Sequence, residues 1–328
     1  LREWWEEYGW GLSIALTDTW GSDFFFRDMT PEQARQWKGL RHDSGDPFEF
    51  GEKVLDFYRG HGIDPHEKML IFSDGLELDT ILRLHDRFGS ERIVDTPVAE
   101  AGFVGLAIGA AIGGMRPVVD FQYGDFLLPA ADQIIQQASK FRLMSGGKVR
   151  VPLTLHAPTG ASGRGAQHAN SIENLFCGVP VLTVGVPSNP YDAKGMFTTA
   201  IRYPDPVLIC SHKHLYGSKG RTVEATALGD VPDEPYELPV GVAEVRRSGA
   251  DVTIVGALLM VHRAMAAAET LAAEGIDAEV IDLRWLSPMD TDTVVESVRK
   301  TGRCIIVQEG SPLGGWGGTV AAAVADRA

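Results

Sequence analysis

Three groups of side chains in this sequence have types and spacing that suit chemistry. Two acidic turns, 41–47 and 72–76, follow predicted strands near the N-terminus, and His168 follows a glycine-rich stretch at 160–165. Carboxylates at the carboxyl ends of strands can hold Mg²⁺ or ribose hydroxyls, and an arginine there can pair with a phosphate. A loop imidazole can move protons near neutral pH. These groups are the candidates for binding and catalysis.

Each group also has an ordinary structural interpretation. The aspartates of the two turns, among them Asp43 and Asp74, can cap the helices that follow, and the residue chemistry alone favours this capping role. A loop histidine is usually just exposed, and a single phenylalanine such as Phe126 usually belongs to a hydrophobic core. Residue type and spacing alone therefore do not separate a site from ordinary structure.

Short apolar strands and helices must position these side chains. Near the N-terminus, Thr30 and Pro31 have the residue types of an N-cap and a first helical residue. Strands that alternate with helices indicate a parallel α/β architecture. In the first part of the chain we expect strands at 13–17 and 68–72 and helices at 31–38, 49–59 and 77–87.

The composition changes near residue 92 to one rich in Ala, Gly and Val. Beyond this point the strands are expected at 116–121, 151–156, 181–184, 207–210, 251–256, 278–283 and 304–307. The helices are expected at 100–114, 130–144, 192–201, 260–274 and 291–300. The stretch 211–239 is rich in Lys, Gly, Asp, Glu and Pro, so it is expected to be a linker with little regular structure.

Bulk composition excludes several classes of protein. The chain has 328 residues, which suffice for two or three domains, and a formal net charge of −14. This charge argues against nucleic acid or an anionic membrane as a partner, because both require a basic surface. The three cysteines, Cys177, Cys210 and Cys304, are widely separated and suggest a reducing cytoplasm. No apolar stretch is long enough to span a bilayer.

The N-terminal motifs together resemble one enzyme family. The stretch 14–28, beginning Ile-Ala-Leu-Thr-Asp-Thr-Trp-Gly-Ser-Asp, and the two acidic turns resemble nicotinate phosphoribosyltransferase over about residues 1–88. The resemblance implies a partial α/β barrel and a nicotinate and phosphoribosyl site formed by Arg41, Asp43 and Asp74. The family's phosphorylated histidine and glycine-rich phosphate-binding strand ends have no counterpart here. We therefore expect a vestigial site without phosphoribosyltransferase activity.

A second set of motifs resembles a different family over residues 89–328, the beta subunit of the 2-oxo-acid dehydrogenase decarboxylating component. That group serves pyruvate, branched-chain 2-oxo acids or acetoin and belongs to the transketolase-like superfamily. The resemblance implies a doubly wound, parallel-sheet domain of the thiamine-diphosphate-binding type at 89–212, a linker at 213–239 and a transketolase C-terminal-like α/β domain at 240–328. The motifs lie at 94–103, 114–121, 132–135, 144–147, 166–168, 192–195, 251–255 and 279–284.

This second resemblance also implies a mechanism and partners. Thiamine diphosphate sits between an alpha and a beta subunit of an α₂β₂ heterotetramer, and the alpha subunit holds Mg²⁺ and the diphosphate. The 2-oxo acid is oxidatively decarboxylated, and its acyl group passes to lipoamide on a separate transacylase. The chain by itself is not expected to bind the cofactor well.

Individual residues take roles from the same resemblance. Phe126 corresponds to the residue that packs on the aminopyrimidine ring, Gln122 to a variable position of that pocket, and His168 to a histidine near the reacting carbon. A structural monovalent cation, potassium, is implied with backbone carbonyls as its main ligands. The residues expected around it are Leu153, Ala200 and Asp205.

One departure from the family pattern leaves the function open. The resemblance implies that the glutamate that activates thiamine lies about twenty residues before the stretch 94–97, where this chain has the N-terminal fragment with Asp74 instead. A beta subunit impaired by this loss is the leading hypothesis. A nicotinate phosphoribosyltransferase of NAD synthesis is the alternative. The abrupt seam at 84–92 also raises a third hypothesis, an inactive fusion or assembly product.

Overall fold

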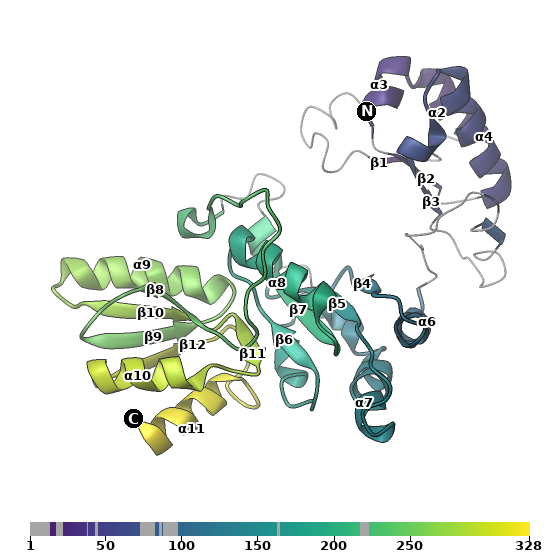
Figure 1. The fold of residues 1–328 in the computed structure, drawn as a ribbon. Coiled ribbons are helices and arrows are strands. Elements are labelled where there is room, and N and C mark those ends of the chain that lie inside the picture. The colour runs from purple at the N-terminus through teal and green to yellow at the C-terminus, as the bar shows by residue number, and fades with distance from the viewer. Residues whose placement is uncertain are drawn as a thin grey trace. The chain divides into compact units, whose positions relative to one another are not determined.

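A computed structural model of the chain describes residues 14–17, 22–37, 39–42, 45–72, 83–84, 87, 98–162, 165–216 and 223–328. Contacts between residues divide the chain into two compact units, Leu1–Ala99 and Glu100–Ala328. Figure 1 shows the helices and strands of both units.

The N-terminal unit contains a three-stranded parallel sheet in the order β1-β2-β3. Thr30 forms a capping box with Gln33 at the start of one helix, and Asp46 caps the long helix α4. Trp37, Leu40 and Tyr58 are almost fully buried in a core that is separate from the core of the second unit. The elements are β1 (Ile14–Leu16), α2 (Ser22–Asp28), α3 (Pro31–Gln36), β2 (Gly39–His42), α4 (Pro47–Gly60), η2 (Pro65–Glu67) and β3 (Met69–Phe72).

Most elements expected in this unit are present, with one correction. The strands expected at 13–17 and 68–72 and the helices expected at 31–38 and 49–59 are confirmed to within a few residues. Arg41 was wrongly placed in a turn: it lies within β2, opposite Leu16 and Ile71. Leu40 is fully buried in the sheet, and the pairing of β2 with both neighbouring strands continues through the next residue. Arg41 is therefore part of the strand. Asp43 and Asp74, and most of the helix expected at 77–87, lie outside the described residues.

The second unit begins with a five-stranded sheet in the order β11-β6-β7-β5-β4. Four of its strands are parallel and β11 runs antiparallel to β6. Every residue of β6 is buried, as expected where helices cover both faces of a parallel sheet. The strands are β4 (Val118–Asp120), β5 (Thr154–Thr159), β6 (Thr183–Gly185), β7 (Val207–His212) and β11 (Trp285–Ser287), and the helices include α6 (Glu100–Ile112), α7 (Phe141–Met144) and α8 (Pro190–Arg202).

A second, four-stranded sheet has the order β12-β9-β10-β8, with β8 antiparallel to β10. Because β11 follows β10 in the chain yet pairs with β6, the last part of the chain contributes a strand to the first sheet. The elements are β8 (Glu244–Arg247), β9 (Val252–Gly256), α9 (Leu259–Ala273), β10 (Ala278–Asp282), α10 (Thr291–Thr301), β12 (Cys304–Val307) and α11 (Gly317–Arg327).

The expected α/β fold with parallel sheets is confirmed, and the differences are local. The helix expected at 130–144 is interrupted: Gln133–Ala138 is π-helical and α7 begins only at Phe141. Both the N–H and the hydroxyl of Ser139 donate to the carbonyl of Ile134, five residues earlier, which selects the wider helix. The antiparallel strands β8 and β11 were not expected.

The expected linker at 211–239 has more structure than its composition suggested. β7 extends through His212, and short 3₁₀ turns follow at Lys213–Tyr216 and Ala225–Ala227. Among the described residues, no helix is both long and apolar enough to cross a membrane.

Candidate functional site

Two of the predicted site residues meet near the end of β4. Phe126 belongs to the short 3₁₀ turn η3 (Gly124–Leu127), and the rings of Phe126 and His168 lie 5.6 Å apart in an edge-to-face arrangement. Tyr123 completes the group, with its ring 4.7 Å from that of His168 and 5.8 Å from that of Phe126. We call these three side chains the aromatic cluster. All three are only partly buried, so the cluster is accessible to a ligand.

Close backbone packing places η3 under the histidine. A Cβ on Gly124 would lie 2.7 Å from Cγ2 of Thr159, so only glycine allows η3 to pack so closely against β5. The side-chain amide of Asn170 donates to Asp125 and, at 2.9 Å, to the carbonyl of Ala166. The segment that carries His168 is thereby tied to the turn that carries Phe126.

Lys213 holds the histidine from the other side. Its ammonium donates to the carbonyl of His168 at 2.8 Å and lies 5.3 Å from the centre of the Tyr123 ring. Lys213 directly follows β7, so a central strand of the sheet positions the backbone of His168. Gln122 lies between β4 and η3 and is exposed.

The cluster suits a flat, weakly polar ring. The faces of partly exposed aromatic side chains attract planar heterocycles, and the imidazole of His168 is a proton donor and acceptor beside them. Asp125 is 7% exposed, and its Oδ2 has no hydrogen-bond partner among the described residues. The other oxygen of this carboxylate accepts from Asn170, so Asp125 serves to hold the turn in place.

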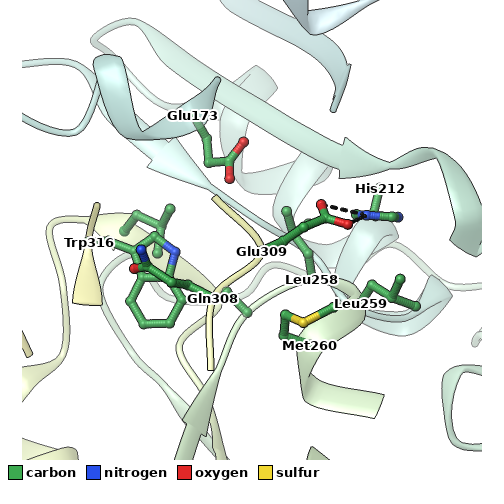
Figure 2. A pocket seen from close by; sticks show the side chains of 10 residues that line it. Glu173, His212, Leu258, Leu259, Met260, Gln308, Glu309 and Trp316 are labelled. Atoms are coloured by element: carbon green, nitrogen blue, oxygen red, sulfur yellow. Dashed lines mark hydrogen bonds and ion pairs between the residues drawn. The ribbon is translucent and has the colours of Figure 1, made fainter. Parts of the chain in front are cut away.

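A second polar group lies at the joint between the two sheets (Figure 2). His212, the last residue of β7, is 3.0 Å from Glu309 Oε2, and the carboxylate of Glu173 faces the same pocket. Glu173 is 4% exposed and its Oε2 has no partner in the described part of the chain. Burial raises the pKa of Glu173 to about 7, so this carboxyl group takes up a proton near neutral pH.

The sequence analysis missed Glu173, His212, Lys213 and Glu309. His212 and Lys213 lie in a stretch that was assigned to a linker, and Glu309 follows a strand for which no chemistry was considered. The one local signal was Glu173, a charged residue within the otherwise mostly apolar run 172–179. The hydrogen bond between His212 and Glu309 joins residues that are 97 positions apart in the chain. Glu173 faces the same pocket from 39 positions before His212, so spacing along the chain did not suggest this group.

The residues expected around a monovalent cation are engaged in other contacts. The carbonyl of Leu153 accepts from the N–H of Val207 at 2.9 Å, and that of Ala200 accepts from Tyr203 at 3.2 Å. Asp205 forms an ion pair with Arg142, and its Oδ1 is buried without a partner among the described residues. The cation site stays a prediction.

Arg116 supplies positive charge close to the residues expected around the cation. Its guanidinium donates to the carbonyls of Ile201 and Tyr203 at 2.8 and 3.0 Å, at the C-terminal end of α8.

Within the part of the chain that the structure describes, no three His, Cys, Asp or Glu side chains are grouped as metal ligands. Of the three residues expected for a phosphoribosyl site, only Arg41 is described, and it is exposed on β2.

Comparison with known families identifies both sheets of the second unit. The profile of the transketolase pyrimidine-binding domain matches residues 27–219, and that of the transketolase C-terminal domain matches residues 241–328. The first match begins well before residue 89, where the sequence motifs of the second resemblance were expected to start.

Three relatives with similar sequences are all beta subunits of oxidoreductases or dehydrogenases, as their names state. The beta subunit of acetoin:2,6-dichlorophenolindophenol oxidoreductase from Cupriavidus necator is 48% identical over 239 residues, which are 73% of this chain and 68% of the relative. The 2-oxoisovalerate dehydrogenase beta subunit of Bacillus subtilis is 41% identical, covering 74% of this chain and 72% of that protein. The beta subunit of the pyruvate dehydrogenase E1 component of Bacillus subtilis is also 41% identical, with coverages of 75% and 73%.

A solved structure shares the same arrangement of elements. A split-gene transketolase, described as an inactive β₄ tetramer, superposes with a TM-score of 0.60 at 26% identity. The superposition covers 76% of each chain.

Proposed function

Because the chain belongs to the transketolase-like family of 2-oxo-acid dehydrogenase beta subunits, we propose that it provides the pyrimidine-side half of a thiamine-diphosphate site. The reaction is oxidative decarboxylation of a 2-oxo acid with transfer of the acyl group to lipoamide. One observation carries the proposal: Phe126 and His168, predicted to flank the cofactor, lie edge to face at 5.6 Å.

Each residue of the site has a defined task in this proposal. Phe126 and Gln122 are the residues that would hold the aminopyrimidine ring, Phe126 by packing against it. His168 donates or accepts a proton at the reacting substrate, and Lys213 holds its backbone in place. When bound, thiamine diphosphate supplies the electron sink that decarboxylation requires. The aromatic cluster suits the flat ring of this cofactor, and the buried carboxylate of Asp125 accepts from Asn170 and so ties the turn that carries Phe126 to the His168 segment.

The partners follow from the half-site. We propose an alpha subunit that holds Mg²⁺ and the diphosphate in an α₂β₂ assembly, and a lipoyl transacylase that accepts the acyl group. The β₄ assembly of the split-gene transketolase is described as inactive, which supports a requirement for a second type of subunit. The relatives act on acetoin, 2-oxoisovalerate and pyruvate, so the substrate class proposed here is a short 2-oxo acid or acetoin. A structural potassium ion near Asp205 belongs to the same proposal.

The proposed function involves only residues 89–328 and assigns no role to residues 1–88. We propose domain limits at 89–212 for the pyrimidine-binding part and 240–328 for the C-terminal part, joined by 213–239. The resemblance of residues 1–88 to nicotinate phosphoribosyltransferase stays a prediction, and the family profile that begins at residue 27 does not favour it. The place expected for the thiamine-activating glutamate, which Asp74 occupies here, lies outside the described residues, so reduced activity also stays a prediction.

Co-expression with an alpha subunit tests the proposal directly. The purified assembly is supplied with thiamine diphosphate, Mg²⁺ and a dye as electron acceptor, and dye reduction is measured with pyruvate, 2-oxoisovalerate and acetoin. We expect reduction that depends on the cofactor and on one of these substrates. Phosphoribosyl transfer to nicotinate is assayed in parallel. An assembly that forms with an alpha subunit but reduces no dye with any substrate would contradict the proposed function.

A further inference from the structure

The segment that carries His168 is fastened on both sides to one carboxylate. The N–H of Ala161 donates to Glu309 Oε2 at 3.3 Å, and the hydroxyl of Ser171 donates to the same oxygen at 3.0 Å. Ala161 precedes His168 in the chain and Ser171 follows it. Glu309 itself comes from the loop after β12, in the C-terminal part of the chain. Glu309, although far away in the sequence, therefore fixes the distance between Ala161 and Ser171 at the two ends of the segment.

Glu309 is in turn fixed to the first sheet by His212. The imidazole Nε2 lies 3.0 Å from Oε2 and 3.2 Å from Oε1 of the carboxylate, and the histidine side chain is only 1% exposed. The next residue, Lys213, donates to the carbonyl of His168. The end of β7 thus contacts the His168 segment twice, once directly and once through Glu309.

Two glycines, Gly160 and Gly310, allow the backbone to pack closely around the His212–Glu309 pair. Gly160 has a φ of +91°, and a Cβ at this position would lie 2.2 Å from Nε2 of His212. Any larger residue at 160 would displace the ring that Glu309 binds. On the other side, a Cβ on Gly310 would lie 2.8 Å from Nδ2 of Asn174, so the backbone after Glu309 packs closely against the stretch that follows Ser171.

The surroundings of Glu309 favour its ionised form, which is the stronger hydrogen-bond acceptor. Partial burial by itself raises the pKa of Glu309, but hydrogen bonds from His212, Ser171 and Ala161 outweigh it and hold the pKa below its usual value. The other carboxyl group of this pocket, Glu173, has a pKa raised to about 7 by burial and so opposes the negative charge of Glu309 less at neutral pH.

We propose that Glu309 is a positioning residue for His168: by binding Ala161, Ser171 and His212 together, it holds the catalytic histidine in place from the C-terminal domain. The role of His168 in this inference rests on the proposed function. An error of about 1 Å in the position of a reacting group can lower a rate by about 100-fold. The cost of losing Glu309 should therefore fall on kcat, while the KM for the 2-oxo acid changes little.

Two measurements on the assembly with an alpha subunit test this inference. The first is amide hydrogen exchange over residues 160–171, which needs no turnover, and the second is steady-state decarboxylation. With Glu309→Ala we expect exchange in this segment to accelerate on the order of tenfold, since two hydrogen bonds to a charged group are lost. We expect kcat to fall by about 10- to 100-fold.

Three further variants separate positioning from general damage. Glu309→Gln keeps an acceptor for Ala161 and Ser171 but loses the charge opposite His212, so both effects should be intermediate. Gly160→Ala displaces His212 from the other side and should reproduce the Glu309→Ala pattern. Glu296→Gln removes a carboxylate from the exposed face of α10 and should leave exchange and kcat unchanged.

The outcomes distinguish this inference from the proposed function. Unchanged exchange in Glu309→Ala overturns the inference whatever the activity, and so does faster exchange with an unchanged kcat. If the unmodified assembly does not decarboxylate any substrate, the proposed function fails and with it the role of His168. The exchange comparison then still decides whether Glu309 orders the segment.

Discussion

At the scale of single residues, environment decides which titratable groups are available for chemistry. His168 and Glu173 are only five positions apart, yet the first is partly exposed in the aromatic cluster and the second is 4% exposed in the pocket behind it. Burial raises the pKa of Glu173 to about 7, so both of its protonation states are populated near neutral pH, whereas the partly exposed ring of His168 is within reach of a ligand. The two residues lead to different expectations.

Replacing His168 should affect chemistry more than folding. Because a positioned general acid or base contributes about 10²- to 10⁴-fold to a rate, we expect His168→Ala to lower kcat in the assembled enzyme by at least about 100-fold. The melting temperature should change little, since the side chain is only partly buried. Dye-coupled decarboxylation and thermal unfolding measure the two effects. His66→Ala, at an exposed position in the N-terminal unit, is the control. Retention of full kcat would remove His168 from the mechanism.

Glu173 should make stability depend on pH. The pKa of this carboxyl group is raised from 4.5 to about 7 in the folded chain, so between these values the unfolded chain loses a proton that the folded chain keeps. Stability from this group is complete below pH 4.5 and is lost as pH rises through 7. Glu173→Gln should therefore match the unmodified chain near pH 4 and exceed it in stability at pH 8, by no more than about 3.4 kcal/mol.

Urea unfolding at the two pH values measures this difference, with Glu296→Gln as an exposed control. Asp282 is also buried with a pKa raised to about 7, so the unmodified chain should lose stability over the same range for a second reason. Only the difference between variant and unmodified chain reports on Glu173. An equal stability difference at both pH values would show that its protonation state is not what matters.

At the scale of elements, ion pairs at helix and strand ends join the parts of the second unit. Asp192, in the first turn of α8, has a fully buried side chain, and Arg284, between β10 and β11, binds both its oxygens at 2.7 and 3.0 Å. Arg284 also lies 2.8 Å from Glu244 of β8. This arginine links α8 of the first sheet to two strands of the second, and it is the counter-ion for a buried carboxylate.

Removing Arg284 should be strongly destabilising. Arg284→Ala leaves Asp192 buried without its partner, which typically costs about 3–5 kcal/mol. Arg284→Lys keeps a charge but loses the two-pronged geometry, so an intermediate loss is expected. Arg202→Ala breaks the exposed pair with Glu237 and should cost less than about 1 kcal/mol. Urea titrations of the three variants test the ranking, and equal losses for Arg284→Ala and Arg202→Ala would contradict it.

At the scale of the whole molecule, the proposed function makes this site one half of a larger one. The described residues supply the aromatic cluster, which includes His168, and family membership adds the expectation of an alpha subunit that binds the diphosphate. Under the proposed function, the partly exposed cluster is the surface that the cofactor and the second subunit would cover. Cofactor binding should consequently depend on assembly.

Thermal shift experiments measure this dependence. A ligand that binds only the folded state at 100 times its Kd stabilises it by about 2.7 kcal/mol. We expect thiamine diphosphate with Mg²⁺ to raise the melting temperature of the assembly with an alpha subunit and to leave that of the chain alone unchanged. Phe126→Ala should reduce the shift in the assembly. An equal shift for the isolated chain would mean that this chain holds the cofactor without a partner.

The alternation of apolar strands with helices was sufficient to predict the parallel α/β fold, because a strand buried on both faces has a distinctive run of apolar residues. The motifs were sufficient to predict the family, and the expected roles of Phe126 and His168 are compatible with the cluster that these residues form. Tertiary structure alone decided the rest. The pairing of β11 with β6 and the contacts of Glu309 with Ala161, Ser171 and His212 join residues far apart in the chain, and no local pattern records such contacts.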